Sequence, residues 1–354
     1  MDNSNKENIR EEIYKQDRKN IAGKSCIEWD KLNGSNVFVT GANGLIGSST
    51  IYGLMEYNHI NSGNIHVTAF LRNVDKAKRL FGDYIEKGWL ELMAGDVLDK
   101  ISYDGNIDYI IHGASETSSR AFVEKPVETI RTAINGTENI LQLALDKKIK
   151  GMVYMSSMEV YGTPLDDKPL TEDRMGYLNP LALRSSYSES KQMVENMCVA
   201  YYSEYEVPVK IVRLTQTFGP GVEKNDGRVF AQFARAVVNG EDIVLQTKGE
   251  THRMYLYTSD AATAILTVLT KGDSGQAYNA ANVNSYCSIW EMANMVAKEF
   301  GAGKSKAVIK MPDVPNTSYN PVMNVYMDTS RIEGLGWRPE VDFVDMYRRM
   351  IDCM

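Results

Sequence analysis

The 354-residue sequence has few of the residues that build metal centres and disulfide frameworks. Its four cysteines are far apart and form no Cys-x-x-Cys pair, and its four histidines show no ligand spacing with one another. Structural zinc sites and disulfide-stapled folds need such clusters. We therefore expect no metal, and we interpret these eight side chains as packing or surface residues.

Long apolar runs and an excess of basic charge are also missing. There is no stretch of about 18 apolar residues, and residues 1–30 are polar and charged, so the sequence predicts neither a membrane span nor a signal peptide. This favours a cytoplasmic protein without membrane contact. The 46 acidic residues outnumber the 39 basic ones, which gives a net charge of -7. A negative surface repels phosphate backbones, so we expect no nucleic-acid partner.

The chain is organised around an apolar, β-prone run that breaks into glycines, Val37-Phe-Val-Thr-Gly-Ala-Asn-Gly-Leu-Ile-Gly47. This pattern predicts a strand, a phosphate-binding turn and a helix. A turn that brings N–H groups against a pyrophosphate needs glycine, and Gly47 lets the helix pack closely on the strand. The Gly-x-x-Gly-x-x-Gly spacing differs from the general dinucleotide fingerprint, so an ordinary tight turn is the alternative. The expected cofactor contacts here are Gly41, Asn43, Gly44, Leu45, Ile46 and Gly47.

Apolar β runs alternate with helical patterns from Asn36 onward, as in βαβ units that form a parallel sheet. The expected strands cover 37–40, 65–71, 90–94, 109–112, 152–156 and 209–213, and the long expected helices cover 127–145 and 187–205. We predict a doubly wound parallel α/β domain over 34–214 and a smaller mixed α/β lobe over 215–354, with segments that return to the first domain. Residues 1–33 are expected to form a surface-packed extension, with an oligomer contact as the alternative.

The second expected strand ends at Arg72, where an NAD-binding chain usually offers an acidic residue to the ribose. An arginine can pair with a 2′-phosphate or stack on adenine, so NADP is expected at least as much as NAD. A solvated arginine is the alternative. Asp96 and Val97 follow the third strand and can meet the adenine. The small residues Gly113, Ala114 and Ser115 follow the fourth strand and leave room for a cofactor.

The segment Tyr187-Ser-Glu-Ser-Lys191 places a phenol and an ammonium on one helix face. The ammonium is expected to lower the pKa of Tyr187, so that Tyr187 can accept a proton from a substrate hydroxyl. Lys191 is also expected to hold the nicotinamide ribose. Upstream, Met155-Ser-Ser-Met-Glu-Val-Tyr-Gly162 leaves a buried strand. Ser157 can bond the same substrate oxygen, and Glu159 can act as an acid or base, or else only cap a loop.

Several ordered motifs resemble the extended short-chain dehydrogenase/reductases that modify nucleotide sugars, the NAD-dependent epimerase/dehydratase family. They are Thr40-Gly-Ala-Asn-Gly-Leu-Ile-Gly47, Asp108-Tyr-Ile-Ile-His-Gly-Ala114, Ser156-Ser-Met-Glu-Val-Tyr-Gly162, Tyr187-x-x-x-Lys191, Arg213-Leu-Thr-Gln-Thr-Phe-Gly-Pro220 and Gly249-Glu-Thr-His-Arg-Met-Tyr-Leu-Tyr-Thr-Ser-Asp260. The resemblance runs from about Gly34 to the C-terminus. It implies a Rossmann domain, tightly bound NAD or NADP, a nucleotide-diphosphate sugar substrate and a homodimer formed through the two long helices.

The resemblance also assigns roles to individual residues. Ser157, Tyr187 and Lys191 are the implied catalytic triad, with Glu159 beside them. The implied contacts near the nicotinamide are Met155 and Leu214, and the implied substrate contacts are Gln216, Val229, Phe230, Arg253 and Asp260. Three residues depart from the family pattern. Gln216 and Ala133 each replace a common Asn, and Met158 precedes Glu159 where dehydratases and decarboxylases have Asp or Ser.

These departures leave the reaction open. Glu159 favours dehydration or decarboxylation, whereas the Ser-Ser-apolar pattern is more like a C4-epimerase. All three reactions share a transient 4-keto sugar. The hypothesis we favour is a C4-epimerase. The alternatives are a nucleotide-sugar 4,6-dehydratase, a UDP-glucuronate-type decarboxylase, an NADPH-dependent reductase and a non-catalytic cofactor-binding protein.

Overall fold

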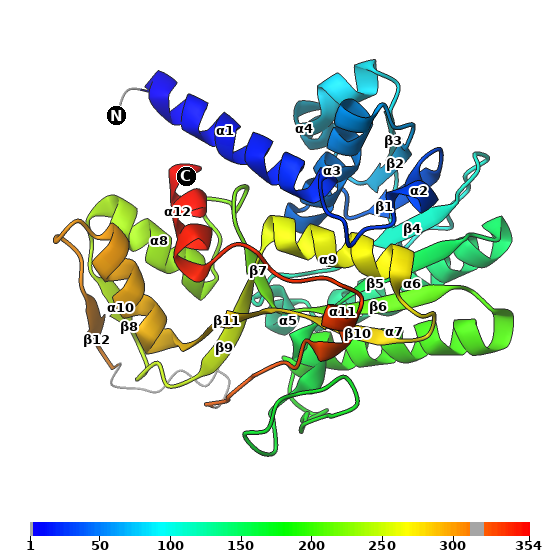
Figure 1. Ribbon diagram of the computed structural model, residues 1–354. Coiled ribbons are helices and arrows are strands. Elements are labelled where there is room, and N and C mark those ends of the chain that lie inside the picture. Colours follow the sequence, from blue (N-terminus) through cyan, green and yellow to red (C-terminus); the bar gives the residue numbers. More distant parts are fainter. Residues whose placement is uncertain (1–2, 312–321) are drawn as a thin grey trace.

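A computed structural model describes residues 3–311 and 322–354, and it is dominated by a seven-stranded sheet (Figure 1). The strand order is β10-β6-β5-β4-β1-β2-β3, and every neighbouring pair is parallel. The strands are β1 (Asn36–Thr40), β2 (His66–Leu71), β3 (Leu90–Ala94), β4 (Tyr109–His112), β5 (Gly151–Ser157), β6 (Val209–Leu214) and β10 (Ala277–Ala280). The predicted doubly wound parallel sheet is confirmed.

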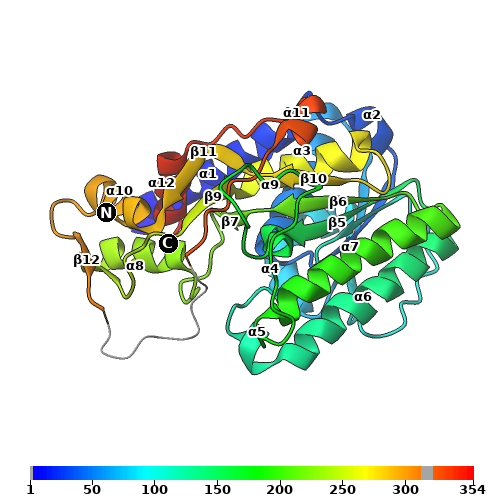
Figure 2. The same ribbon diagram turned by 90° about the horizontal axis from the view of Figure 1, so that it is seen from below.

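Helices cover both faces of this sheet, which explains why its central strands are apolar on both sides. One face carries α2 (Trp29–Leu32), α3 (Leu45–Asn61), α4 (Val74–Glu86) and α9 (Thr258–Lys271). The other carries α6 (Pro126–Lys147) and α7 (Ser185–Tyr205), which lie side by side in Figure 2. Successive residues of β1 point to opposite cores, since Val37 and Val39 pack with α3 and α9 while Phe38 packs with α6 and α7.

The C-terminal lobe contains two small sheets. In the first, β9 (His252–Tyr257) pairs in parallel with β7 (Gln216–Phe218) and antiparallel with β11 (Asn282–Ser288). In the second, β8 (Ile243–Leu245) pairs in parallel with β12 (Ala307–Ile309). The helices of this lobe are α8 (Val229–Asn239), α10 (Ile289–Phe300) and α12 (Phe343–Asp352), seen at the left of Figure 1. The predicted mixed C-terminal lobe is thus confirmed.

Several C-terminal segments belong to the large sheet. Strand β10 forms its edge beside β6, α9 packs on β5 and β6, and α11 (Ser330–Gly334) lies against β10. At the other end of the chain, α1 (Asn3–Ala22) packs on α3 and α9 and also reaches α12. Residues 1–2 of the expected extension and residues 312–321 of the expected lobe lie outside the described part of the chain.

Candidate active site

A cavity of about 650 Å³ opens at the carboxyl ends of β1, β2, β4, β5 and β6. This is the edge at which open α/β sheets bind ligands. It collects most of the residues that the sequence singles out: Gly41, Asn43, Gly44, Leu45, Ile46, Gly47, Arg72, Asp96, Val97, Gly113, Ala114, Ser115, Met155, Ser157, Glu159, Tyr187, Lys191, Leu214 and Gln216. Segments far apart in the sequence therefore meet in one site.

The glycine turn is shaped first by the protein's own packing. Gly41 has a φ of +67°, and a Cβ there would lie 2.8 Å from the carbonyl carbon and oxygen of Gly113. A Cβ on Gly47 would lie 2.3 Å from the carbonyl oxygen of Gly41. Gly44 is the N-cap of α3 and provides no side-chain cap. The first N–H groups of α3 thus face the cavity without a side-chain cap, which suits a bound anion.

Two cations stand at the end of the cavity next to β2. Arg72 is 82% exposed, and its Nη1 lies 3.8 Å from Oδ2 of Asp96. Lys76, which the sequence analysis did not single out, lines the same end and pairs at 3.4 Å with Glu223 of the C-terminal lobe. The Oδ1 atom of Asn73 caps α4 by accepting from the N–H of Lys76. A ribose phosphate group at this end would face positive charge rather than a carboxylate alone.

Tyr187 and Lys191 project from the first turns of α7 into the centre of the cavity. The Nζ of Lys191 donates to the carbonyl of Met155 at 2.8 Å and lies 5.7 Å from the centre of the Tyr187 ring. The hydroxyl of Tyr187 shares a hydrogen bond with Ser157. Ser157 in turn accepts from the N–H of Glu159 at 3.2 Å, which fixes the turn after β5.

Burial is the largest influence on the pKa values of Tyr187 and Lys191. It raises the pKa of Tyr187, and the hydrogen bond with Ser157 is the largest opposing influence. The expectation that the Lys191 ammonium lowers the pKa of Tyr187 is wrong for this geometry, since Lys191 is directed to the Met155 carbonyl instead. Burial lowers the pKa of Lys191 to about 8, and the nearby Glu195 carboxylate acts in the opposite direction.

Glu159 and Met158 have different surroundings although they are adjacent. Both line the cavity. The carboxylate of Glu159 pairs at 3.6 Å with the guanidinium of Arg184, which stands at the start of α7. Met158 is buried, and its sulfur lies 3.2 Å from the hydroxyl of Thr215, which donates to the carbonyl of Met254 at 2.5 Å. The cavity therefore has one carboxylate at this point, and the neighbouring position offers no proton-transferring group.

Part of the expected substrate-binding set lies outside the cavity lining. Gln216 lines the cavity, but Phe230 is fully buried and stacks on Phe218 with ring centres 4.7 Å apart. Asp260 is also buried, and its carboxylate accepts the backbone N–H groups of Glu340 and Val341. A buried carboxylate needs such donors. Through these two bonds Asp260 holds the chain segment that leads to α12.

Val229 and Arg253 also lie outside the cavity lining. Val229 begins α8 and is partly exposed. Arg253 lies on β9, and its Nε is buried without a hydrogen-bond partner among the described residues. A buried guanidinium nitrogen with no partner is costly, so it marks Arg253 as a residue able to meet an anion.

Sequence reasoning missed several residues at the site. Phe122 of α5 (Ala121–Glu124) stacks on Tyr187 with ring centres 4.2 Å apart and 11° between the planes. Arg228 lines the cavity and is held by the carboxylate of Asp226. No periodic pattern marks these loop residues, whereas Arg184 could have been found, since it lies one turn before Tyr187 on the same helix start.

Two further expectations concern metal-binding clusters and membrane-spanning helices. Across residues 3–311 and 322–354 no three His, Cys, Asp or Glu side chains gather as a metal site would require. Within those ranges every helix is also too short or too polar to cross a bilayer.

The family model that describes the NAD dependent epimerase/dehydratase family matches residues 37–283. UDP-glucuronic acid decarboxylase 6 from Arabidopsis thaliana is 31% identical over 306 residues, which cover 86% of this chain and 84% of that protein. The fold is shared with a dTDP-glucose 4,6-dehydratase from Streptomyces venezuelae, solved with NAD bound (TM-score 0.75, 23% identity, 89% and 95% of the two chains). It is also shared with a UDP-glucose 4-epimerase from Thermotoga maritima (TM-score 0.76, 21% identity, 90% and 98%).

Proposed function

Because the chain belongs to the NAD-dependent epimerase/dehydratase family, we propose that it oxidises C4 of a nucleotide sugar and then acts at C5 through Glu159. The observation that carries this proposal is the position of Glu159 in the same cavity as Ser157, Tyr187 and Lys191. A carboxylate at that point has a chemical task only if the reaction continues beyond C4.

The residues of the cavity fit a dinucleotide. Gly41 and Gly47 leave no side chain over the turn, and the start of α3 has N–H groups for the pyrophosphate. We assign Asp96 and Val97 to the adenine end and Lys191 to the nicotinamide ribose, and all three line the cavity. The chemistry that bound NAD supplies is acceptance of a hydride from C4 and its later return.

The protein's own groups manage the protons. Tyr187 takes the proton of the C4 hydroxyl, and Ser157 holds the same oxygen, as their shared hydrogen bond supports. The Lys191 ammonium, which donates to the carbonyl of Met155, is assigned to the nicotinamide ribose and not to the phenol oxygen. Phe122, stacked flat on the Tyr187 ring, keeps the ring in one orientation and excludes water from one of its faces.

Decarboxylation of a UDP-glucuronate-type sugar is the reaction that these side chains support best. Once C4 is a ketone, the C5–C6 bond breaks, CO₂ leaves, and the electron pair of that bond forms the C4–C5 enolate. One proton, drawn from water, then adds to C5, and Glu159 is the residue we assign to deliver it. Dehydration needs a second acid for the departing C6 hydroxyl, and Met158 provides none. The 31% identity to a UDP-glucuronic acid decarboxylase also supports this choice.

C4 epimerisation is the second candidate. In that reaction the ketone only rotates and is reduced from its other face. It needs no second acid, so a methionine beside Glu159 would not impair it. The apolar, buried Met158 favours it. Incubation of the protein with UDP-, dTDP-, GDP- and CDP-sugars, followed by mass spectrometry, separates the candidates, because we expect loss of CO₂ from UDP-glucuronate. An isobaric product would select epimerisation, and loss of water would select dehydration.

Two finer properties belong to the same proposal. We propose tightly bound cofactor, because the hydride returns within one catalytic cycle, and acceptance of NADP beside NAD through Arg72 and Lys76. We also propose a homodimer built on α6 and α7, where Val127 and Met193 are 56% and 51% exposed. Large apolar side chains on neighbouring helices are typical of such an interface.

A further inference from the structure

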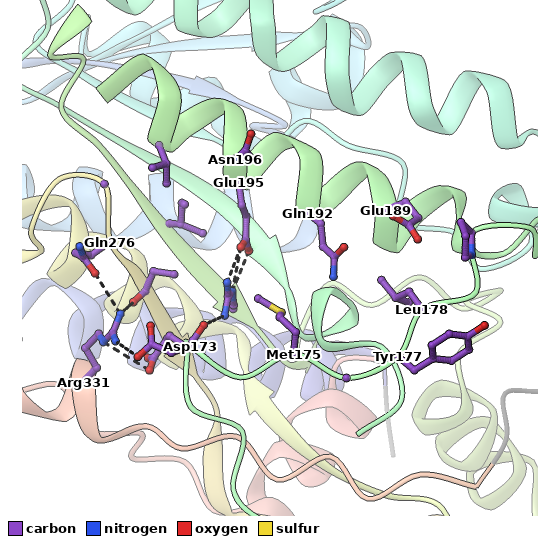
Figure 3. A pocket seen from close by; sticks show the side chains of 18 residues that line it. Asp173, Met175, Tyr177, Leu178, Glu189, Gln192, Glu195, Asn196, Gln276 and Arg331 are labelled. Atoms are coloured by element: carbon purple, nitrogen blue, oxygen red, sulfur yellow. Dashed lines mark hydrogen bonds and ion pairs between the residues drawn. The ribbon is translucent and has the colours of Figure 1, made fainter. Parts of the chain in front are cut away.

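Glu195 and Arg213 form a buried ion pair near the catalytic lysine, Lys191. Glu195 is one helical turn after Lys191 on α7, and its carboxylate accepts from Nη2 of Arg213 at 2.7 Å and from Nε at 3.0 Å. The hydroxyl of Ser156 donates to the same carboxylate at 2.5 Å. Figure 3 shows Glu195 reaching from α7 into this contact. Both charged side chains are almost fully buried.

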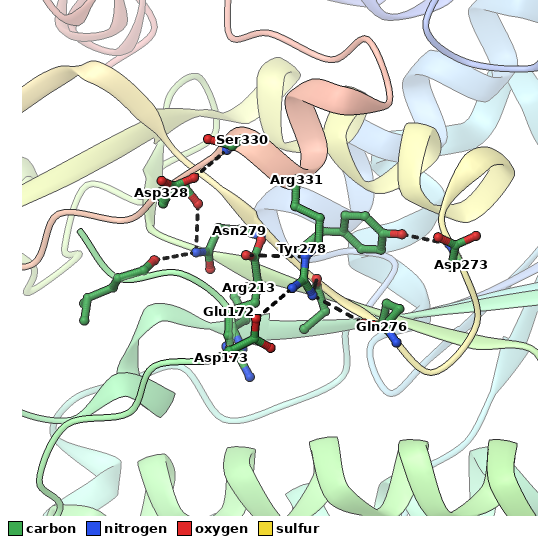
Figure 4. A network of polar contacts seen from close by, with 12 residues as sticks. Glu172, Asp173, Arg213, Asp273, Gln276, Tyr278, Asn279, Asp328, Ser330 and Arg331 are labelled. Atoms are coloured by element: carbon green, nitrogen blue, oxygen red, sulfur yellow. Dashed lines mark hydrogen bonds and ion pairs between the residues drawn. The ribbon is translucent and has the colours of Figure 1, made fainter. Parts of the chain in front are cut away.

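The guanidinium is itself held in place from two other segments. Its Nη1 donates to the carbonyl of Glu172 at 2.7 Å and to the hydroxyl of Tyr161 at 3.0 Å. The Tyr161 hydroxyl donates onward to Oδ1 of Asn279 on β10. Figure 4 shows Arg213 and Glu172 in this network. Arg213 is therefore fixed, and it fixes the carboxylate of Glu195 in turn.

We propose that Glu195 is a positioning residue that keeps Lys191 charged and aimed at the carbonyl of Met155. Desolvation works against the ammonium, since Lys191 is buried and makes one direct hydrogen bond, to Met155. A carboxylate one turn away favours the charged form. Arg213 and Ser156 hold that carboxylate in place, because each donates to it.

The other groups around Lys191 do not supply this negative charge. The Nζ lies 4.6 Å from the centre of the Tyr154 ring on β5, and the pKa of Tyr154 is raised by burial. Burial also raises the pKa of Cys198 on α7 and of Tyr187. On β4, burial lowers the pKa of His112 to about 3, so that the ring is neutral. Among the described residues, Glu195 is thus the carboxylate that acts to raise the pKa of Lys191.

The direct test is the pKa of Lys191 itself, measured by NMR on protein with ¹³Cε-labelled lysine. The resonance is assigned by its loss in Lys191→Met. Lys191 has a pKa of about 8, and Glu195→Gln is expected to lower it by about one unit or more. At pH 7 the charged fraction would then fall from about nine-tenths to about half. An unchanged pKa in folded Glu195→Gln would overturn the proposal.

Two variants separate this role from a purely structural one. Tyr161→Phe removes a hydrogen bond to Arg213 but no charge, so it is expected to lower stability and leave the pKa of Lys191 unchanged. Glu195→Asp keeps the charge and is expected to restore most of the pKa. If Glu195→Gln fails to fold because Arg213 is left unpaired, the double variant Glu195→Gln/Arg213→Gln removes both charges. A smaller fall in the pKa of Lys191 is expected there, because the Arg213 cation that opposes the ammonium is removed as well, and a pKa equal to or above the wild-type value would count against the proposal.

A kinetic arm rests on the proposed C4 oxidation. If charged Lys191 is required, activity falls as pH rises through its pKa, and Glu195→Gln moves this alkaline limb to lower pH by about one unit. A wild-type enzyme that turns over no sugar nucleotide would refute the proposed function but leave the NMR result standing. An active wild type whose alkaline limb does not move in Glu195→Gln would refute only the role of Glu195.

Discussion

Replacement of Glu159 by glutamine tests which reaction follows the C4 oxidation. The substitution keeps the shape of the side chain and removes its charge. The Glu159 side chain is 23% exposed, and its partner Arg184 is 27% exposed at a distance of 3.6 Å. Partly exposed pairs of this kind contribute about 0 to 1 kcal/mol to stability. The variant is therefore expected to unfold near the wild-type denaturant midpoint.

The catalytic effect is expected to be much larger than the effect on stability. Removal of a general acid or base slows a reaction by about 10² to 10⁴, or about 3 to 5 kcal/mol in the barrier. If Glu159 protonates C5, Glu159→Gln should still reduce its nicotinamide when substrate is added, and release little product. The assay is the near-ultraviolet absorbance of the reduced ring, followed together with product by mass spectrometry.

A loss of less than about tenfold in Glu159→Gln would refute the C5 role and support epimerisation. The matched control is Tyr187→Phe, which lacks the hydroxyl that shares a hydrogen bond with Ser157. It should abolish the absorbance change itself. A Tyr187→Phe protein that still reduces its nicotinamide would overturn the proposed C4 chemistry altogether.

Other predictions concern cofactor, assembly and pH. Arg72→Asp should weaken NADP binding more than NAD binding in calorimetry, and equal losses would remove the 2′-phosphate role. The protein should be a dimer by light scattering and Met193→Glu a monomer, whereas a wild-type monomer would exclude the α6 and α7 interface. Burial raises the pKa of Asp260 from 3.8 to about 6, so the folded state holds this proton more tightly and stability falls as pH rises from about 4 through 6. Asp260→Asn should remove about 3 kcal/mol of this fall in the free energy of unfolding, measured by urea titration at about pH 4 and about pH 6. An unchanged pH dependence in the variant would disprove the prediction.

The large sheet could be predicted from the sequence because its strands are continuous apolar runs separated by helical patterns. The edge strand β10 could not. Its four residues include Asn279, whose amide donates to the carbonyl oxygens of Leu170 and Asp328 and whose side-chain oxygen accepts from Tyr161. A short strand that carries a buried polar network has no hydrophobic period to detect. It forms because distant segments satisfy its polar groups.

The residues of the site could likewise be predicted from the sequence only in part. The glycine turn and the Tyr187 and Lys191 pair follow from local spacing, and the structure brings them into one cavity. Phe230 and Asp260 are buried outside the cavity lining, and a motif position does not reveal whether a side chain faces the ligand or the core. The preference for an epimerase rests on the Ser-Ser-apolar pattern that ends at Met158, and it stays a prediction. Since a thioether carries no transferable proton, the lack of a second acid at this position also follows from the residue type, and the structure adds that Met158 lines the cavity.

The N-terminal helix α1 makes buried contacts that its polar, weakly patterned sequence does not predict. The composition of α1 predicts only a surface-packed extension, yet its Asp17 is buried and accepts from the Tyr257 hydroxyl at 2.7 Å and from Nη1 of Arg349 at 2.8 Å. Ile21 of the same helix packs so closely on α3 that a Cβ on Gly53 would lie 2.2 Å from its Cγ2. Helix α1 thus contacts the layer that carries the glycine turn through one residue, and β9 and α12 of the C-terminal lobe through another. Because the cavity borders both parts, a helix that ties them together also holds the two sides of the site in register.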